Sequence, residues 1–312
     1  MEHAPSAPGR ILATQVLERG APGYPQRLLQ LARPPEVLYV RGSTASLSEP
    51  QIAIVGARAA SPAGCATAFE FAAALARAGL TVTSGLALGI DTAGHEGALA
   101  DGGATVALCA HGLDRVYPPQ NTPLAGRIER HGALASLHAD GIGARRQHFP
   151  ARNALISALS IAVVVVEAQP GSGSLITARQ AQTQGRRVFA VPGSIRDPLS
   201  LGCNQLIRAG ATAVTNPAEL LSDLGLSESK YSNEIQIVAS HGKTGRTAQA
   251  QASSLDKHLE MLLDAAGFEP VGIDFLADRT NLSAAAVVSM LLLLELQGRI
   301  APQPGGRYRR LT

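Results

Sequence analysis

The sequence predicts an α/β protein with a doubly wound, mostly parallel sheet and a small separate domain at the C-terminus. Two observations carry this prediction. Short apolar segments of strand length alternate with helical segments from residue 51 to residue 216, as βαβ units do. After residue 226, a polar stretch precedes a second group of helical segments. A change of composition of this kind is typical of a linker between domains.

Seven segments read as strands, and each is almost wholly apolar, as expected for parallel strands buried on both faces. They are residues 52–56, 80–85, 104–110, 132–137, 161–168, 187–193 and 211–216. Helical segments such as 66–78 and 175–184 lie between them. This order predicts a Rossmann-like sheet, whose ligands bind beyond the carboxyl ends of the strands.

The chain divides into four parts by composition. Residues 1–48 are Pro-rich and read as an N-terminal extension with a short helix and an extended segment, and residues 49–226 form the Rossmann-like domain. Residues 227–254 are rich in Ser, Gln, Gly and Thr and read as a flexible linker, followed by a domain at 255–312.

The last domain reads as a winged helix. Three helices are expected at 255–266, 271–278 and 284–297, followed by two short strands around a Gly-Gly turn. The wing carries four arginines and no acid, which suits a phosphate backbone; a solvated basic tail is the alternative. These arginines are Arg299, Arg307, Arg309 and Arg310.

Composition excludes several classes of protein. The chain has 312 residues, 46% hydrophobic and 16% charged, which argues against disorder, coiled coil and collagen. Its three cysteines are odd in number and far apart, so neither a disulfide framework nor a metal site is expected, and a reducing cytoplasm is the expected location. No signal peptide or membrane-spanning segment is recognisable. The net charge of +3 permits an anionic partner.

Small residues follow the predicted strands and would surround one crevice. Gly56 leads to Arg58, Ser84 precedes Gly85, and a Gly-Ser-Gly-Ser turn opens the helix before Thr177. Backbone N–H groups at such a turn form an anion site, so Ser172, Gly173 and Ser174 are candidate phosphate ligands. The GxGxxG fingerprint is absent after the first strand, and the domain has no lysine for a P-loop. These absences argue against NAD binding and against the nucleoside triphosphate hydrolysis of P-loop proteins.

An aromatic, a cation and an amide stand together in the segment that contains Phe149, Arg152 and Asn153. Single-stranded nucleic acid is held by such a set, with a base stacked on the ring and a phosphate on the arginine. The alternative is a helix start with one buried Phe. For Arg58, the alternative is an ordinary surface arginine.

Six motifs in order together resemble the DNA-processing protein DprA (Smf) family. They occupy residues 54–58, 84–91 with His95, 112–118, 149–153, 172–177 and 188–193. The resemblance implies a cytoplasmic homodimer that binds single-stranded DNA, protects incoming strands during natural transformation and loads the recombinase RecA. It also implies that Arg58 is a principal DNA contact and that Phe149, Arg152 and Asn153 belong to the same site.

The chain departs from the family pattern at three positions where the family often has a cation. Leu88, Pro119 and Ala154 stand there instead. Each lost phosphate contact removes about 0.7 unit of salt slope on single strands, so weaker binding or greater use of the basic wing is expected.

Two other functions compete with single-strand binding. A phosphoribohydrolase-like enzyme would need a carboxylate just after the loop 170–174, and residues 175–179 supply none. A hydrolytic set of Ser84, Asp91 and His95 lacks the elbow motif around the serine. A winged-helix regulator with the large domain as sensor is the other alternative. No catalytic residue, metal or cofactor is therefore expected.

Overall fold

The computed structural model describes residues 13–226 continuously, and parts of the C-terminal region. Those parts are residues 261–263, 265–266, 271–280, 282, 287, 290–291, 294–295, 299–303 and 307–310. Contacts divide the chain into two units, Met1–Val238 and Ala239–Thr312, each of which is described by itself. The predicted linker 227–254 lies outside the described residues.

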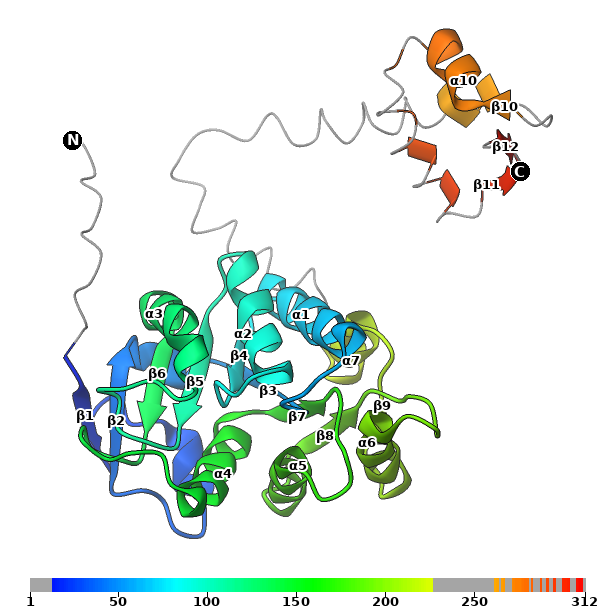
Figure 1. Cartoon of the computed structure of the whole chain (residues 1–312). Helices are drawn as coiled ribbons and strands as arrows, with labels where there is room; N and C mark the ends of the chain where they lie inside the picture. The colour runs from blue at the N-terminus through cyan, green and yellow to red at the C-terminus, as the bar shows by residue number, and fades with distance from the viewer. Residues whose placement is uncertain are drawn as a thin grey trace, which may run out of the picture. The chain divides into compact units, whose positions relative to one another are not determined.

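The large unit is built on a nine-stranded sheet in the order β1-β2-β6-β5-β4-β3-β7-β8-β9 (Figure 1). The seven strands from β6 to β9 in this order are parallel, as predicted. They are β3 (Gln51–Val55), β4 (Thr81–Ser84), β5 (Thr105–Cys109), β6 (Ala133–Ser136), β7 (Ala162–Val165), β8 (Arg187–Ala190) and β9 (Thr212–Ala213).

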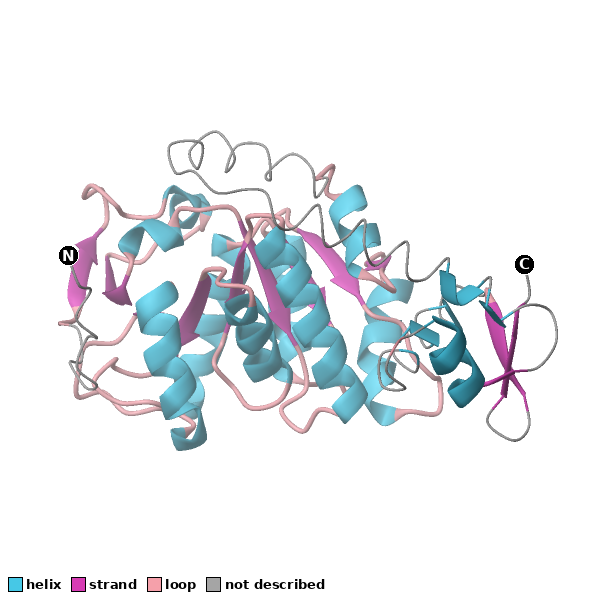
Figure 2. Ribbon diagram, turned by 90° about the horizontal axis from the view of Figure 1, so that it is seen from above, coloured by secondary structure: helices cyan, strands magenta, loops and turns pink. Residues whose placement is uncertain are grey.

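Helices cover both faces of this sheet (Figure 2). Side chains alternate along each strand: Ile52 and Ile54 join the core under one helical layer, and Ala53 and Val55 the core under the other. The first layer holds α1 (Pro62–Arg77), α2 (Ile90–Ala100) and α7 (Pro217–Asp223). The second layer holds α4 (Phe149–Leu159), α5 (Gly173–Thr183) and α6 (Pro198–Arg208). Helix α3 (Thr122–His131) packs with β5 and β6.

Strands β3 and β7 are parallel neighbours, and the strands that follow each of them in sequence lie on opposite sides of this pair. From β3 the chain continues through β4, β5 and β6 on one side; from β7 it continues through β8 and β9 on the other. The helices that follow these two strands, α1 and α5, lie on opposite faces. Their ends therefore diverge, and a crevice opens beyond the carboxyl ends of β3 and β7.

The sheet begins earlier in the chain than the boundary predicted at residue 49. Strand β1 (Gln15–Glu18) pairs antiparallel with β2 (Val37–Gly42), and β2 pairs antiparallel with β6. Leu38 and Val40 of β2 are fully buried in the core of the second layer. Their burial gives this edge of the sheet an apolar anchor, and the short helix η1 (Gln26–Gln30) contacts α4.

The small unit has a winged-helix pattern in its described residues. Strands β10 (Val271–Gly272), β12 (Arg307–Arg310) and β11 (Ile300–Gln303) form a sheet in that order. The helix predicted at 271–278 starts two residues later, as α10 (Ile273–Thr280), because Val271 and Gly272 pair with β12. The core of this unit includes Leu276.

Within the described part of the chain, no helix is both long enough and apolar enough to cross a membrane.

The N-terminus of α1 supplies a stability prediction. The Ser61 hydroxyl accepts a hydrogen bond from the Gly64 N–H and donates to Glu167, which follows β7. Ser61→Ala should lower the free energy of unfolding by about 1 kcal/mol, as loss of an N-cap does. Ser172→Ala is the matched control, because Ser172 precedes α5 without a side-chain cap bond. Equal shifts in urea midpoint for the two variants would contradict the role assigned to Ser61.

Candidate nucleic-acid interface

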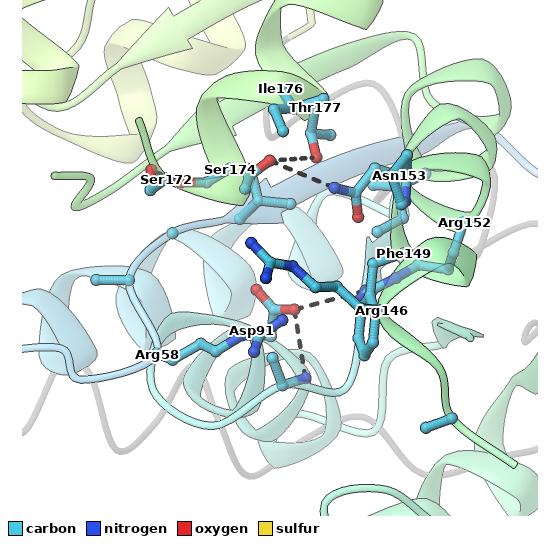
Figure 3. A pocket seen from close by; sticks show the side chains of 18 of the residues that line it. Arg58, Asp91, Arg146, Phe149, Arg152, Asn153, Ser172, Ser174, Ile176 and Thr177 are labelled. Atoms are coloured by element: carbon cyan, nitrogen blue, oxygen red, sulfur yellow. Dashed lines mark hydrogen bonds and ion pairs between the residues drawn. The ribbon is translucent and has the colours of Figure 1, made fainter. Parts of the chain in front are cut away.

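A cleft of about 680 Å³ occupies the crevice beyond β3 and β7 (Figure 3). Segments distant in sequence form its wall: the turn after β3, the loop after β4, the start of α4 and the start of α5. Of the predicted site residues, those that line it are Gly56, Arg58, Phe149, Arg152, Asn153, Ser172, Gly173, Ser174 and Thr177. The fold thus brings most of the predicted site together.

Two predicted residues lie elsewhere. Gly85 lines an adjoining pocket of about 150 Å³. Ser84 lines neither cavity, because it is the last residue of β4, fully buried, and its hydroxyl donates to the Ile54 carbonyl over 2.6 Å. The Ser84 side chain, predicted as a DNA contact, thus ties β4 to β3 and does not face the cleft.

Two glycines in the turns are required by close packing. A Cβ on Gly56 would lie 2.6 Å from Ile90 Cγ1 and 2.8 Å from the Glu167 carbonyl oxygen. A Cβ on Gly85 would lie 1.2 Å from Nη1 of Arg152. Gly56 therefore lets the turn after β3 pass between α2 and the end of β7, and Gly85 leaves room for the Arg152 guanidinium.

Two arginines are exposed in the cleft. Arg58 follows β3, and its Cζ lies 5.3 Å from the centre of the Phe149 ring. Arg146, in the short helix η4 (Arg146–His148), extends into the cleft from the opposite wall (Figure 3). Among the described residues, no carboxylate forms an ion pair with either arginine. Both guanidinium groups are thus available to an anion.

Arg146 was missed by the sequence analysis. Its signal was the Arg-Arg pair directly before the segment that contains Phe149. The contacts of His148 hold η4, and with it Arg146, at the cleft. The His148 Nδ1 lies 3.1 Å from the Ala110 carbonyl oxygen, and the ring centres of His148 and His138 are 3.9 Å apart. Arg146 thus adds a second exposed cation to the cleft. Of the three positions where the sequence departs from the resembled pattern, Leu88 lines the adjoining pocket, and Pro119 and Ala154 line neither cavity.

Phe149 begins α4 and is half-buried between cations and an aromatic ring. The Arg152 Cζ lies 5.5 Å from its ring centre, and the Tyr117 ring meets it edge-on at 6.4 Å. Cation–π contacts at these distances stabilise an aromatic ring. The ring therefore has a defined position at the centre of the cleft wall.

Arg152, predicted as a phosphate contact, is buried in the wall of the cleft. Only 5% of the residue is exposed, and its Nε has no hydrogen-bond partner in the structure. Its Nη1 lies 3.9 Å from Oδ2 of Asp91, at the start of α2. Burial lowers the pKa of Arg152 and raises that of Asp91, while the guanidinium and the N–H groups of Ala87 and Gly85 oppose the shift at Asp91.

The start of α5 opens onto the cleft without a side-chain cap. The Ser172 hydroxyl pairs with that of Ser174 over 2.8 Å. Asn153 and Thr177 both donate to the Gly173 carbonyl, at 3.3 and 3.4 Å. Asn153 and Thr177 therefore support this turn, and the positive end of the helix dipole favours an anion beside it.

The carboxylates near the cleft are occupied by structural contacts. Glu167 accepts hydrogen bonds from the N–H and hydroxyl of Ser61. His95 is fully buried, bonds Thr105 through Nδ1, and has its pKa lowered to about 3 by burial and by Arg152. Ser84, Asp91 and His95 are thus each engaged in contacts within the fold. Among the described residues, no group of three or more His, Cys, Asp or Glu side chains is placed to hold a metal.

Three of the four wing arginines lie on β12, and Arg299 directly precedes β11. Arg307 and Arg309 are exposed, whereas Arg310 and Arg299 are half-buried. Tyr308, between the two exposed arginines, packs against the core of the small unit. Alternation along the strand thus leaves two of the four predicted arginines fully on the solvent side.

Comparison with known proteins agrees with this architecture. The sequence model of the family described as DNA recombination-mediator protein A matches residues 15–225, and that of the DprA winged helix domain matches residues 246–306. Protein Smf of Escherichia coli is 40% identical over 296 residues, covering 92% of this chain and 75% of that protein. The DNA processing protein DprA of Streptococcus pneumoniae is 42% identical over 200 residues, covering 64% and 71%.

Two solved structures are similar as well. The X-ray structure of Streptococcus pneumoniae DprA aligns with a TM-score of 0.65 at 40% identity, over 67% of this chain and 74% of that one. DNA processing protein A from Helicobacter pylori, described for its unique single-stranded DNA binding mode, aligns with a TM-score of 0.63 at 31% identity, over 68% and 96%. This chain belongs to the DprA (Smf) family of DNA recombination-mediator proteins.

Proposed function

We propose that this protein binds single-stranded DNA in the cleft, protects incoming strands during natural transformation and loads RecA onto them in the cytoplasm. The observation that carries the DNA-binding part is the placement of two exposed arginines, Arg58 and Arg146, in a cleft whose wall holds the Phe149 ring. Phosphates and an unstacked base are the groups that such a set holds. The Helicobacter pylori relative, described for single-stranded DNA binding, supports the same ligand here.

The shape of the cleft favours a single strand over a duplex. The ring of Phe149 lies on the wall of a cleft between strand ends, and bases in a duplex are stacked on one another and unavailable to it. The exposed start of α5 offers a further site for a phosphate. A strand whose bases are free to turn can use both features at once.

Transformation, RecA loading and a homodimer rest on family resemblance. The proposal includes no catalysis, because Asp91 and Glu167 are engaged in structural contacts. The first experiment is a gel shift with oligo-dT and a duplex of equal length. A parallel incubation with nucleoside monophosphates should release no free base; release would favour a phosphoribohydrolase instead.

The exposed cations generate a prediction on salt dependence. Arg58→Ala and Arg146→Ala should each weaken oligo-dT binding by about 1 to 3 kcal/mol, through loss of a charge-assisted phosphate contact. Each should also lower the slope of log affinity against log salt by about 0.7. Arg145→Ala is the matched control, since Arg145 is exposed next to Arg146 but does not line the cleft. Equal slopes for Arg145→Ala and Arg146→Ala would remove Arg146 from the site.

Phe149 is expected to act through stacking rather than charge. Phe149→Ala should cost about 1 to 3 kcal/mol of binding free energy at a nearly constant salt slope. Fluorescence anisotropy titrations at several salt concentrations measure both quantities. A sharp drop in melting temperature with unchanged affinity of the folded fraction would assign Phe149 to the core alone.

The winged helix is proposed as an accessory DNA contact through Arg307 and Arg309. A chain ending at Leu226 should fold, dimerise and bind oligo-dT, and should lose affinity for duplex or long strands in a salt-dependent way. Two tethered sites gain affinity from effective concentration, and this gain disappears with the second site. Complete loss of oligo-dT binding, or no change in any DNA affinity, would contradict this division of labour.

A further inference from the structure

Asp91 is an unexpected residue in a cleft that binds phosphates. It is the one acidic side chain among the described residues that line the cleft. A carboxylate there opposes phosphate binding, because it cancels part of the positive charge that releases counterions. Its presence therefore calls for a structural benefit that outweighs this electrostatic cost.

The contacts of Asp91 point to that benefit. Its Oδ2 accepts hydrogen bonds from the N–H groups of Gly85 and Ala87, at 3.1 and 3.3 Å, and lies 3.9 Å from Nη1 of Arg152. Leu86, between the two donors, has a φ of 60°. A non-glycine residue in this conformation persists only where its surroundings hold it. Asp91 thus holds both the loop after β4 and the Arg152 guanidinium.

Arg152 in turn lies beneath the residue proposed to stack on a base. Its side chain is 6% exposed, and its Cζ lies 5.5 Å from the Phe149 ring centre. Gly85 has no side chain where the guanidinium passes, so the arginine fits against the loop that Asp91 holds. A continuous series of contacts therefore runs from Asp91 through Arg152 to Phe149, and Arg58 rests on the same ring.

We propose that Asp91 is a positioning residue of the single-stranded DNA site, which acts through Arg152 to fix the Phe149 ring for stacking. This inference rests on the proposed function. It assigns Arg152 to ring placement and leaves phosphate contact to Arg58 and Arg146. An aromatic platform placed before binding loses less freedom when a base stacks on it.

The substitution Asp91→Asn separates a positioning role from a charge effect, because the two predict changes of opposite sign in oligo-dT affinity. Asparagine keeps the size of the side chain and removes one negative charge from the cleft. If Asp91 positions Phe149, oligo-dT binding weakens by about tenfold, the size of one lost base stack, even though the cleft has lost a negative charge. If Asp91 acts only by charge, binding becomes tighter and the slope steeper by about 0.7. The second outcome would overturn the proposal.

A direct readout of stacking accompanies these titrations. An oligonucleotide that contains 2-aminopurine reports base stacking through quenching of its fluorescence. Asp91→Asn should reduce the quenching that the protein produces at saturation, and Arg146→Ala should leave it unchanged. Asp101→Asn is the matched control for loss of a negative charge, because Asp101 pairs with Arg77 away from the cleft. Unchanged quenching in Asp91→Asn would overturn the proposal.

Arg152→Lys keeps the proposal testable if Asp91→Asn does not fold, as judged by urea unfolding. Lysine retains the charge and lacks the planar guanidinium, so binding should weaken at unchanged slope. Wild-type affinity and quenching in this variant would overturn the positioning role. If the wild-type chain itself fails to bind oligo-dT, the proposed function fails first. Binding by the wild type with tighter binding by Asp91→Asn defeats the positioning role alone.

Discussion

The divergence of the chain at β3 and β7 is the constraint on which the site depends. These strands are neighbours, but the helices that follow them pack on opposite faces of the sheet. In the described part of the chain, the carboxyl ends of the two strands are therefore left open as a cleft. Glu167, just after β7, bonds Ser61 at the start of α1 and so ties the two sides of the crevice together.

Burial divides the residues of the cleft by task. Arg58 and Arg146 are exposed and give the cleft positive charge, which the proposed function assigns to phosphate contact. Arg152 and Asp91 are almost fully buried and set the position of the groups above them. Removing one partner of a buried pair leaves an uncompensated charge, so these two residues depend on each other more than exposed pairs do. The exposed arginines thus carry the positive charge of the cleft, and the buried pair of Arg152 and Asp91 fixes the position of its wall.

The carboxylates near the cleft are engaged in structural contacts. Glu167 is held at the start of α1, and Asp91 is held against Arg152 and two backbone donors. A catalytic carboxylate must reach the reacting atoms and exchange a proton with them. These contacts therefore support the proposed binding function over a catalytic one.

Local patterns in the sequence were enough to predict the fold class and most of the residues that line the cleft. Apolar runs such as those at β3 and β7 read directly as buried parallel strands, and turns that begin with Gly56 and Ser172 mark their carboxyl ends. Such patterns are local, so a single segment carries the whole signal. The Arg-Arg pair that contains Arg146 was visible as well, but nothing local says that η4 faces the cleft.

The depth of each side chain was set by packing between distant segments. Ser84 and Arg152 stand in predicted site motifs, yet both are buried, because β4 ends inside the sheet and Gly85 admits the guanidinium. The membership of β1 and β2 in the sheet was hidden for the same reason, since pairing with β6 joins residues distant in sequence. Burial depends on what packs against a residue from elsewhere in the chain, and a local pattern does not contain that information.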